Sequence, residues 1–155
     1  MTAKTGYVYD KATGKIKYTV ENVNPNLIEN FRENTTSGCF IGDVGYNISG
    51  TYVKLDEKTK EPIEVSQIEH MDFLRLNKHE ILSDGKDEAV ISGLRIGTNV
   101  DVNHEWGYVV TEETGDSLEI SCNNYSYIPE NNLISVYFKS YGCHDSQIKI
   151  KVVEG

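Results

Sequence analysis

The sequence of 155 residues lacks both a long hydrophobic stretch and a leader typical of secreted proteins. No apolar run approaches the ~20 residues that a helix needs to span a bilayer. Residues 1–6 contain neither a basic segment nor an apolar segment of the kind found in signal peptides. We therefore expect no membrane insertion and no secretion by the usual route.

Cysteine is scarce. The chain has three, Cys39, Cys122 and Cys143, an odd number without any C-x-x-C spacing. Disulfide frameworks normally use an even number of cysteines, and zinc sites use closely spaced pairs. The sequence therefore predicts neither, and free thiols in a reducing cytosol are the expectation.

Positive charge is also in short supply, because 15 basic side chains stand against 24 acidic ones and give a formal net charge of -9. This sign repels nucleic-acid phosphates and anionic lipids, so we expect no nucleic-acid partner. The excess is uneven, since residues 1–78 carry net -1 and residues 79–155 carry net -8. Such a difference between the two halves indicates two modules.

Motifs for catalysis, metals and cofactors are missing from the sequence. It contains no H-E-x-x-H spacing, no phosphate-binding loop and no dinucleotide fingerprint. Cys143 and His144 set a thiol beside an imidazole, but no third partner is identifiable. Residues 83–88 gather carboxylates, yet they keep only fragments of the ligand order of a calcium loop, and a solvated turn is the simpler interpretation. We predict no enzyme activity, no cofactor and no metal.

Tyrosine and glycine are plentiful, with 10 and 13 residues against only 3 prolines, and this composition favours strands and turns. The pattern at the start predicts a hairpin of strands 7–9 and 16–20. Asn24 followed by Pro25 predicts the start of one short helix. A second hairpin, of strands 51–55 and 63–65, completes the β-rich module that we predict for residues 1–66, with a linker at 67–78.

The second half predicts an immunoglobulin-like β-sandwich over residues 79–155. Turn signals separate short β candidates at nearly regular spacing, as is typical of such sandwiches. In the last of them, Ile148, Ile150 and Val152 alternate with polar residues, so one face is expected to be buried. The fold class is therefore predicted as all-β. The seven strand candidates are residues 81–82, 89–91, 100–102, 108–110, 118–120, 133–138 and 148–152.

Aromatic residues supply the candidates for binding. Trp106 and Tyr108 share one face of a predicted strand, as do Tyr125 and Tyr127, and each pair can form a platform that stacks on a sugar or a partner. Core filling is the alternative for Trp106, and packing is the alternative for the other pair. At the N-terminus we assign three tyrosines to docking, namely Tyr7, Tyr9 and Tyr18.

Three turn-rich segments add a family resemblance. They read YDKATGKI at 9–16, IGDVGYNISGTYVKLD at 41–56 and LSDGKDEAVISGLRIGTNVDV at 82–102. In these segments the sequence resembles a group of small accessory virion proteins of tailed bacteriophages. The resemblance implies a structural component of the tail, baseplate or fibre attachment that ends in an immunoglobulin-like domain.

The expected function is therefore that of a non-enzymatic virion protein, made in the host cytoplasm and localised to the particle. Its partners would be tail, baseplate or fibre subunits, or a second copy of the chain. Three alternatives stay open: a carbohydrate-binding module that recognises a surface glycan, a capsid-decoration module, and an assembly chaperone for tail fibres.

Overall fold

A computed structural model of the chain describes residues 4–43, 48–123 and 132–154. Strands account for 50% of the chain and helix for 5%, so the predicted all-β class is confirmed. The molecule divides into two compact units. The N-terminal unit is Met1–Glu69 with Tyr141–Cys143, and the C-terminal unit is His70–Ser140 with His144–Gly155. The predicted division places Tyr141–Cys143 in the second module, whereas in the structure these residues belong to the N-terminal unit.

The N-terminal unit contains a three-stranded antiparallel sheet of order β2-β1-β3. The central strand β1 (Lys4–Asp10) pairs with β2 (Ile16–Glu21) and with β3 (Ser37–Asp43), and the first pairing confirms the predicted hairpin. At its turn, Oδ1 of Asp10 accepts a hydrogen bond of 2.7 Å from the Ala12 amide. Gly14 adopts a φ of +82°, which glycine reaches without steric cost.

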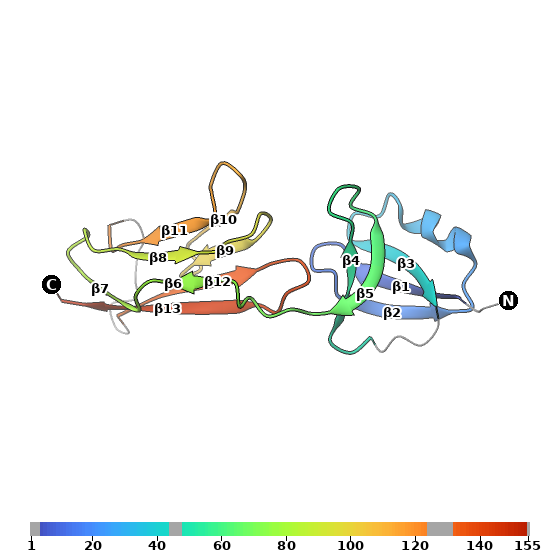
Figure 1. Cartoon of the computed structure of the whole chain (residues 1–155), viewed down its shortest axis with the longest axis horizontal. Helices are drawn as coiled ribbons and strands as arrows, with labels where there is room; N and C mark the ends of the chain where they lie inside the picture. Colours follow the sequence, from blue (N-terminus) through green and yellow to red (C-terminus); the bar gives the residue numbers. More distant parts are fainter. Residues whose placement is uncertain (1–3, 44–47, 124–131, 155) are drawn as a thin grey trace. The chain divides into compact units, whose positions relative to one another are not determined.

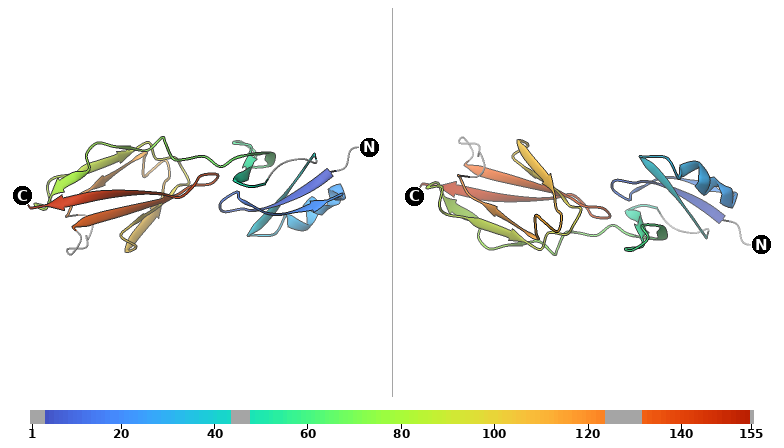
Figure 2. Two further views of the ribbon diagram at one scale, coloured as in Figure 1. Left: turned by 90° about the horizontal axis from the view of Figure 1, so that it is seen from below. Right: turned by 90° about the horizontal axis from the view of Figure 1, so that it is seen from above.

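Both faces of β1 are covered, and Figure 2 shows the two covering layers on opposite sides of the sheet. On one side Tyr7 and Tyr9 pack with Val53 of β4 (Thr51–Leu55), which pairs with β5 (Pro62–Gln67). The 3-10 helix η1 (Pro25–Phe31) covers the other side, where a Cβ on Gly6 would lie 3.2 Å from Leu27 Cδ2.

The helix begins as predicted. Asn24 is its N-cap, Pro25 is the first helical residue, and the Asn24 side chain accepts a hydrogen bond of 2.9 Å from the Asn26 amide. It is a 3-10 helix, and none of its residues is fully buried. Its contact with the sheet therefore depends on half-buried side chains such as Leu27, Ile28 and Phe31.

The returning segment, Tyr141–Cys143, is bonded into the N-terminal unit at several points. The Tyr141 hydroxyl donates to the carbonyl oxygen of Val53, and the Tyr141 ring meets the Tyr52 ring edge-on at 5.8 Å. The Gly142 amide donates to the Thr13 carbonyl over 2.8 Å, and the Gly142 carbonyl accepts from Glu69 over 2.9 Å. This short segment therefore completes the packing around β4.

The C-terminal unit consists of two sheets that lie as two layers in Figure 2. The larger has the order β10-β9-β12-β13-β7 and the smaller has the order β11-β8-β6. Each of the seven predicted strands occurs within two residues of its expected bounds, whereas β6 falls in the expected linker. The bounds are β6 Arg75–Leu76, β7 Glu80–Leu82, β8 Ala89–Ser92, β9 Asn99–Val102, β10 Trp106–Val109, β11 Ser117–Ile120, β12 Leu133–Lys139 and β13 Ser146–Val153 (Figure 1).

Each sheet of this unit buries one face. Ile134, Val136 and Phe138 alternate along β12 and are fully buried, while Ile91 and Ile120 fill the same role on the smaller sheet. The last strand follows its predicted pattern, since Ile150 and Val152 are buried, Ile148 is half-buried and Lys149 and Lys151 are exposed. Strand β7 pairs with β13 in parallel, and the other strand pairs in this unit are antiparallel.

Candidate functional site

The strongest candidate surface from the sequence lies on β10, at the end of the larger sheet. Trp106 is 44% exposed, and its ring centroid lies 5.0 Å from that of Tyr108, with 42° between the planes. Trp106 and Tyr108 each make at least one further noncovalent interaction within the chain. Because Trp106 is exposed, core filling, the alternative for Trp106, is wrong, and Trp106 forms an aromatic pair with the half-buried Tyr108.

The register of β10 shows which face the aromatic pair occupies. Trp106 lies opposite Val102 and Tyr108 lies opposite Val100, and directly paired residues of antiparallel strands project to the same side. Val100 and Val102 are 3% and 1% exposed, so that side is the core side of the sheet. The aromatic pair therefore continues the buried face outward, at the strand where the sheet ends.

A groove of about 530 Å³ lies over the same strands, and most of its lining comes from residues that project away from the core, although Tyr108 also lines it. Its lining includes Asp101 and Tyr137, which project away from the core, and His104 from the turn after β9. The His104 ring stacks on Tyr137 at 4.4 Å between centroids, and Oδ1 of Asp101 accepts a hydrogen bond of 2.7 Å from the His104 amide. We call this the outer groove.

The outer groove offers stacking faces, an amide, a carboxylate and an ammonium group. Asn99 lies two residues before Asp101 on β9, and Lys139 lies opposite Asn99 on β12. These groups can donate or accept hydrogen bonds to a polar ligand. They present no nucleophile with an adjacent base. The arrangement is therefore suited to binding.

Sequence reasoning missed the outer groove because no single motif marks it. Two weaker signals point to it: Tyr137 alternates with Val136 and Phe138 and so must face away from the core, and Asn103–His104 ends a strand as a turn. Only the pairing of Tyr137 with Asp101 brings the two segments together.

The three N-terminal tyrosines assigned to docking do not share one environment. Tyr7 is 1% exposed and Tyr9 is 5% exposed, because β1 lies between two covering layers. Tyr18, on the edge strand β2, is 50% exposed. The assignment of Tyr7 and Tyr9 to a docking surface is thus corrected to a role in the core, and Tyr18 is the exposed member. Tyr125 and Tyr127 lie outside the described residues.

The cysteines offer weak nucleophiles. All three are free thiols; Cys39 and Cys143 are buried and Cys122 is half-buried. Burial raises the pKa of the Cys39 thiol, and burial together with the charge of Asp84 raises that of Cys122, which keeps both protonated at neutral pH. The His144 ring stacks on His70 at 4.8 Å between centroids.

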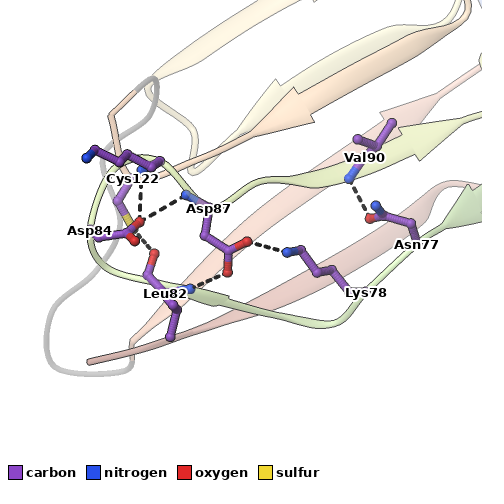
Figure 3. A network of polar contacts seen from close by, with 8 residues as sticks. Asn77, Lys78, Leu82, Asp84, Asp87, Val90 and Cys122 are labelled. Atoms are coloured by element: carbon purple, nitrogen blue, oxygen red, sulfur yellow. Dashed lines mark hydrogen bonds and ion pairs between the residues drawn. The ribbon is translucent and has the colours of Figure 1, made fainter. Parts of the chain in front are cut away.

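The carboxylates of residues 83–88 build a turn, drawn in Figure 3. Oδ1 of Asp84 accepts hydrogen bonds from the amides of Lys86 and Asp87 at 2.8 and 2.9 Å. Asp87 accepts from the Lys78 ammonium group and, over 2.8 Å, from the Leu82 amide. These hydrogen bonds lower the pKa of both carboxyl groups. Their oxygens are therefore used by donors of the chain itself.

Comparisons with models of protein families, with curated proteins and with solved structures found no match to this chain. Among the described residues, no three His, Cys, Asp or Glu side chains are grouped so as to hold a metal ion. No helix in the described part of the chain has the length and hydropathy needed to span a bilayer.

Proposed function

We propose that this chain is a non-enzymatic structural component of a bacteriophage virion, associated with the tail or baseplate. In this proposal the N-terminal unit docks onto neighbouring subunits and the C-terminal unit is an immunoglobulin-like domain that faces outward. The resemblance of segments 9–16, 41–56 and 82–102 to accessory virion proteins supports the proposal. The strand order of the C-terminal unit is the observation that carries it.

That order agrees with an immunoglobulin-like sandwich. In such domains the third, sixth and seventh strands pair in one sheet with an optional strand outside the third, and the first, second, fifth and fourth pair in the other. Among the described residues, the smaller sheet has counterparts of the first, second and fifth strands only. The larger sheet here has β9, β12 and β13 in this relation, with β10 outside β9, and the smaller has β6, β8 and β11. The first strand contributes to both sheets, through β6 and then β7.

The charges of the two units fit the proposed roles. The N-terminal unit carries eight basic and ten acidic side chains, whereas the C-terminal unit carries seven and fourteen. An acidic outward module stays soluble and repels its copies, which keeps neighbouring projections apart on a particle. The N-terminal unit, in which positive and negative charges are nearly balanced, is repelled less by acidic neighbouring proteins.

Mass spectrometry of purified particles tests the proposal. The expected result is that peptides of this chain are recovered from gradient-purified particles in a constant ratio to the major structural protein. Recovery from infected cells but not from particles would contradict the proposal and favour an assembly chaperone. Location on the capsid by labelled-antibody electron microscopy would favour a decoration module.

Carbohydrate binding is the second candidate function, and the aromatic pair of the exposed Trp106 and the half-buried Tyr108 favours it. Sugar rings stack on tryptophan and tyrosine faces, and Trp106 is the only tryptophan of the chain, so its fluorescence reports on this surface alone. A glycan that binds is expected to change the emission of Trp106, and Tyr108→Ala is expected to weaken the response. Tyr18→Ala, in the N-terminal unit, is the control. Flat titrations across a glycan panel would remove this candidate.

A further inference from the structure

A pocket of about 250 Å³ in the N-terminal unit is lined by more basic than acidic side chains, whereas the chain as a whole is acidic. Its lining residues come from β1 and from β3, one of the two edge strands of the three-stranded sheet, from η1 and from the region of the turn between β4 and β5. Figure 1 shows where these elements lie. The turn contributes Lys60 and Glu61, β5 contributes Pro62, and η1 contributes Ile28 and Phe31. We call this the basic pocket.

Three basic side chains line the pocket against one acidic side chain. Lys11, Arg32 and Lys60 face Glu61, in a chain whose formal net charge is -9. Arg32 is paired with Glu29 at 2.7 Å, so its charge is partly offset. A local excess of positive charge within an acidic protein creates a potential that attracts an anion.

The cation at Lys11 is held in place by neutral groups. Its Nζ donates to the carbonyl oxygens of Phe31, at 3.3 Å, and of Asn34. Asn34 is fixed in turn, because its side chain accepts hydrogen bonds of 2.9 Å from the amides of Thr36 and Ser37. Carbonyl oxygens position an ammonium group without cancelling its charge, so Lys11 is preorganised for an anion.

The wall of the pocket is aromatic and is set by a glycine. Tyr9 lies with the end of its ring over Gly38, where an added Cβ would come within 2.6 Å of the Tyr9 hydroxyl oxygen. Burial, the charge of Glu61 and the nearby Cys39 raise the pKa of Tyr9. With Ile28 and Phe31, the ring provides apolar contact for the body of a ligand.

We infer that the basic pocket binds a carboxylate of a neighbouring protein, from an acidic side chain or a chain terminus attached to an apolar residue. Lys11 and Lys60 receive the carboxylate, and the apolar side chains of Ile28 and Phe31 contact the adjoining residue. A small pocket whose mostly polar lining includes two lysines, with apolar contact from Ile28 and Phe31, fits a monoanion attached to an apolar group. The inference rests on the proposed docking role and specifies its chemistry.

Binding of small model compounds tests the pocket directly. We expect N-acetylphenylalanine to bind the full chain with a dissociation constant of about 1 mM, the strength expected for so small a ligand. The Gly38 amide signal in ¹H–¹⁵N spectra should shift on titration, because Gly38 lines the pocket. N-acetylphenylalanine amide, which has the same body without the charge, should cause no saturable shift.

Three substitutions in one turn supply matched variants. Lys60→Gln removes a lining cation and should weaken binding about threefold, while Glu61→Gln removes the opposing anion and should tighten it about threefold. Lys58→Gln, in the same turn but outside the lining residues, should leave the dissociation constant unchanged. Equal shifts with the acid and the amide, or the same affinity in all three variants, would overturn the inference.

The outcome is separable from that of the proposed function. If the acid binds as expected and the chain is absent from purified particles, the carboxylate site stands and the virion role falls. If the chain is present in particles but the acid does not bind, docking takes place elsewhere. An N-acetylated glutamyl-phenylalanine amide distinguishes a side-chain carboxylate from a terminal one. If neither this compound nor N-acetylphenylalanine binds, the inference is contradicted.

Discussion

The two units of this chain build a core in different ways. In the C-terminal unit each sheet buries one face, so strands such as β12 and β13 alternate between buried and exposed residues. In the N-terminal unit, β1 is buried on both faces and Tyr7, Val8 and Tyr9 are consecutive core residues. The periodicity of the sequence predicts a core in which each sheet buries one face. A strand buried on both faces is not predicted in this way, because its burial depends on which elements the fold packs against each face.

The two units also differ in how far apart in the sequence their parts lie. The C-terminal unit is built from residues 70–140 and 144–155, while the N-terminal unit takes in the returning segment from far along the sequence. Tyr141 and Gly142 contact Tyr52, Val53 and Thr13 there. An early, hairpin-rich module can thus require a segment from far along the chain to complete its packing.

The largest expected effect concerns the one-faced core. Phe138 is fully buried on β12, and Phe138→Ala is expected to lower the free energy of unfolding by about 3–5 kcal/mol, because the lost contacts leave a cavity. Urea unfolding followed by Trp106 fluorescence measures it, since the only tryptophan lies in this unit. Val109→Ala, at a side chain that is 49% exposed, should change the value by less than about 0.5 kcal/mol. Equal losses in both variants would break the comparison.

The next effect concerns the returning segment. Gly142 has a φ of +74°, and an added Cβ would lie 2.5 Å from the Tyr52 ring. Gly142→Ala should destabilise by about 1 kcal/mol for the backbone and by about 2 kcal/mol more for the clash. Gly50→Ala is the matched control, because Gly50 has a φ of +67° and open space around it. Near-ultraviolet circular dichroism of the tyrosines follows the unfolding, and equal losses would mean that the segment does not pack on Tyr52.

A smaller effect sharpens the account of the C-terminal unit. Asp87 accepts from Lys78 and from the Leu82 amide, which lowers its pKa in the folded state. The stabilisation is therefore present above the unfolded pKa of about 3.9 and is lost as the pH falls through the lower folded value. Asp87→Ala should have a lower Tm than the wild type at pH 7, and the difference should vanish near pH 2.

The control for this pH effect is Asp145→Ala, whose carboxylate lies 4.0 Å from Lys139 in an exposed pair. Exposed pairs contribute little, so its Tm should stay close to that of the wild type at both pH values. A difference between Asp87→Ala and the wild type that is the same at pH 7 and pH 2 would contradict the role of the charged Asp87 carboxylate.

The smallest expected effect falls on the exposed tyrosine of the N-terminal unit. Tyr18 is 50% exposed on the edge strand β2, so Tyr18→Ala should change the free energy of unfolding by less than about 0.5 kcal/mol. Chemical denaturation measures this value. A loss above about 2 kcal/mol, as large as that of a buried side chain, would show that Tyr18 belongs to the core with Tyr7 and Tyr9.

The strands of the C-terminal unit were predictable because burial alternates with a period of two. Ile148, Ile150 and Val152 show the pattern, and glycine or asparagine turns separate the segments. Strand β6 was not predictable, since the apolar residues of segment 67–78 follow neither a helical nor a strand period. Its pairing is determined by β8, where Leu76 lies opposite Ile91.

The candidate sites were predictable only in part. Trp106 stands out as the sole tryptophan, but its exposure depends on its place at the end of the sheet, which the sequence does not reveal. Tyr7 and Tyr9 are amphipathic side chains in a polar context and resemble docking residues, and only the two layers over β1 explain their burial. The basic pocket joins residues from positions 9 to 62, a combination that no local motif encodes.

Carbodiimide cross-linking of intact purified particles, followed by mass spectrometry, tests the central claim most directly. The reagent joins an amine to a contacting carboxylate without a spacer, so it reports docking and its chemistry together. The account predicts that the chain is present in the particle and that Lys11 or Lys60 is linked to an acidic residue or terminus of a neighbouring protein. Absence of the chain from the particles, or cross-links to neighbours through the C-terminal unit alone, would contradict it.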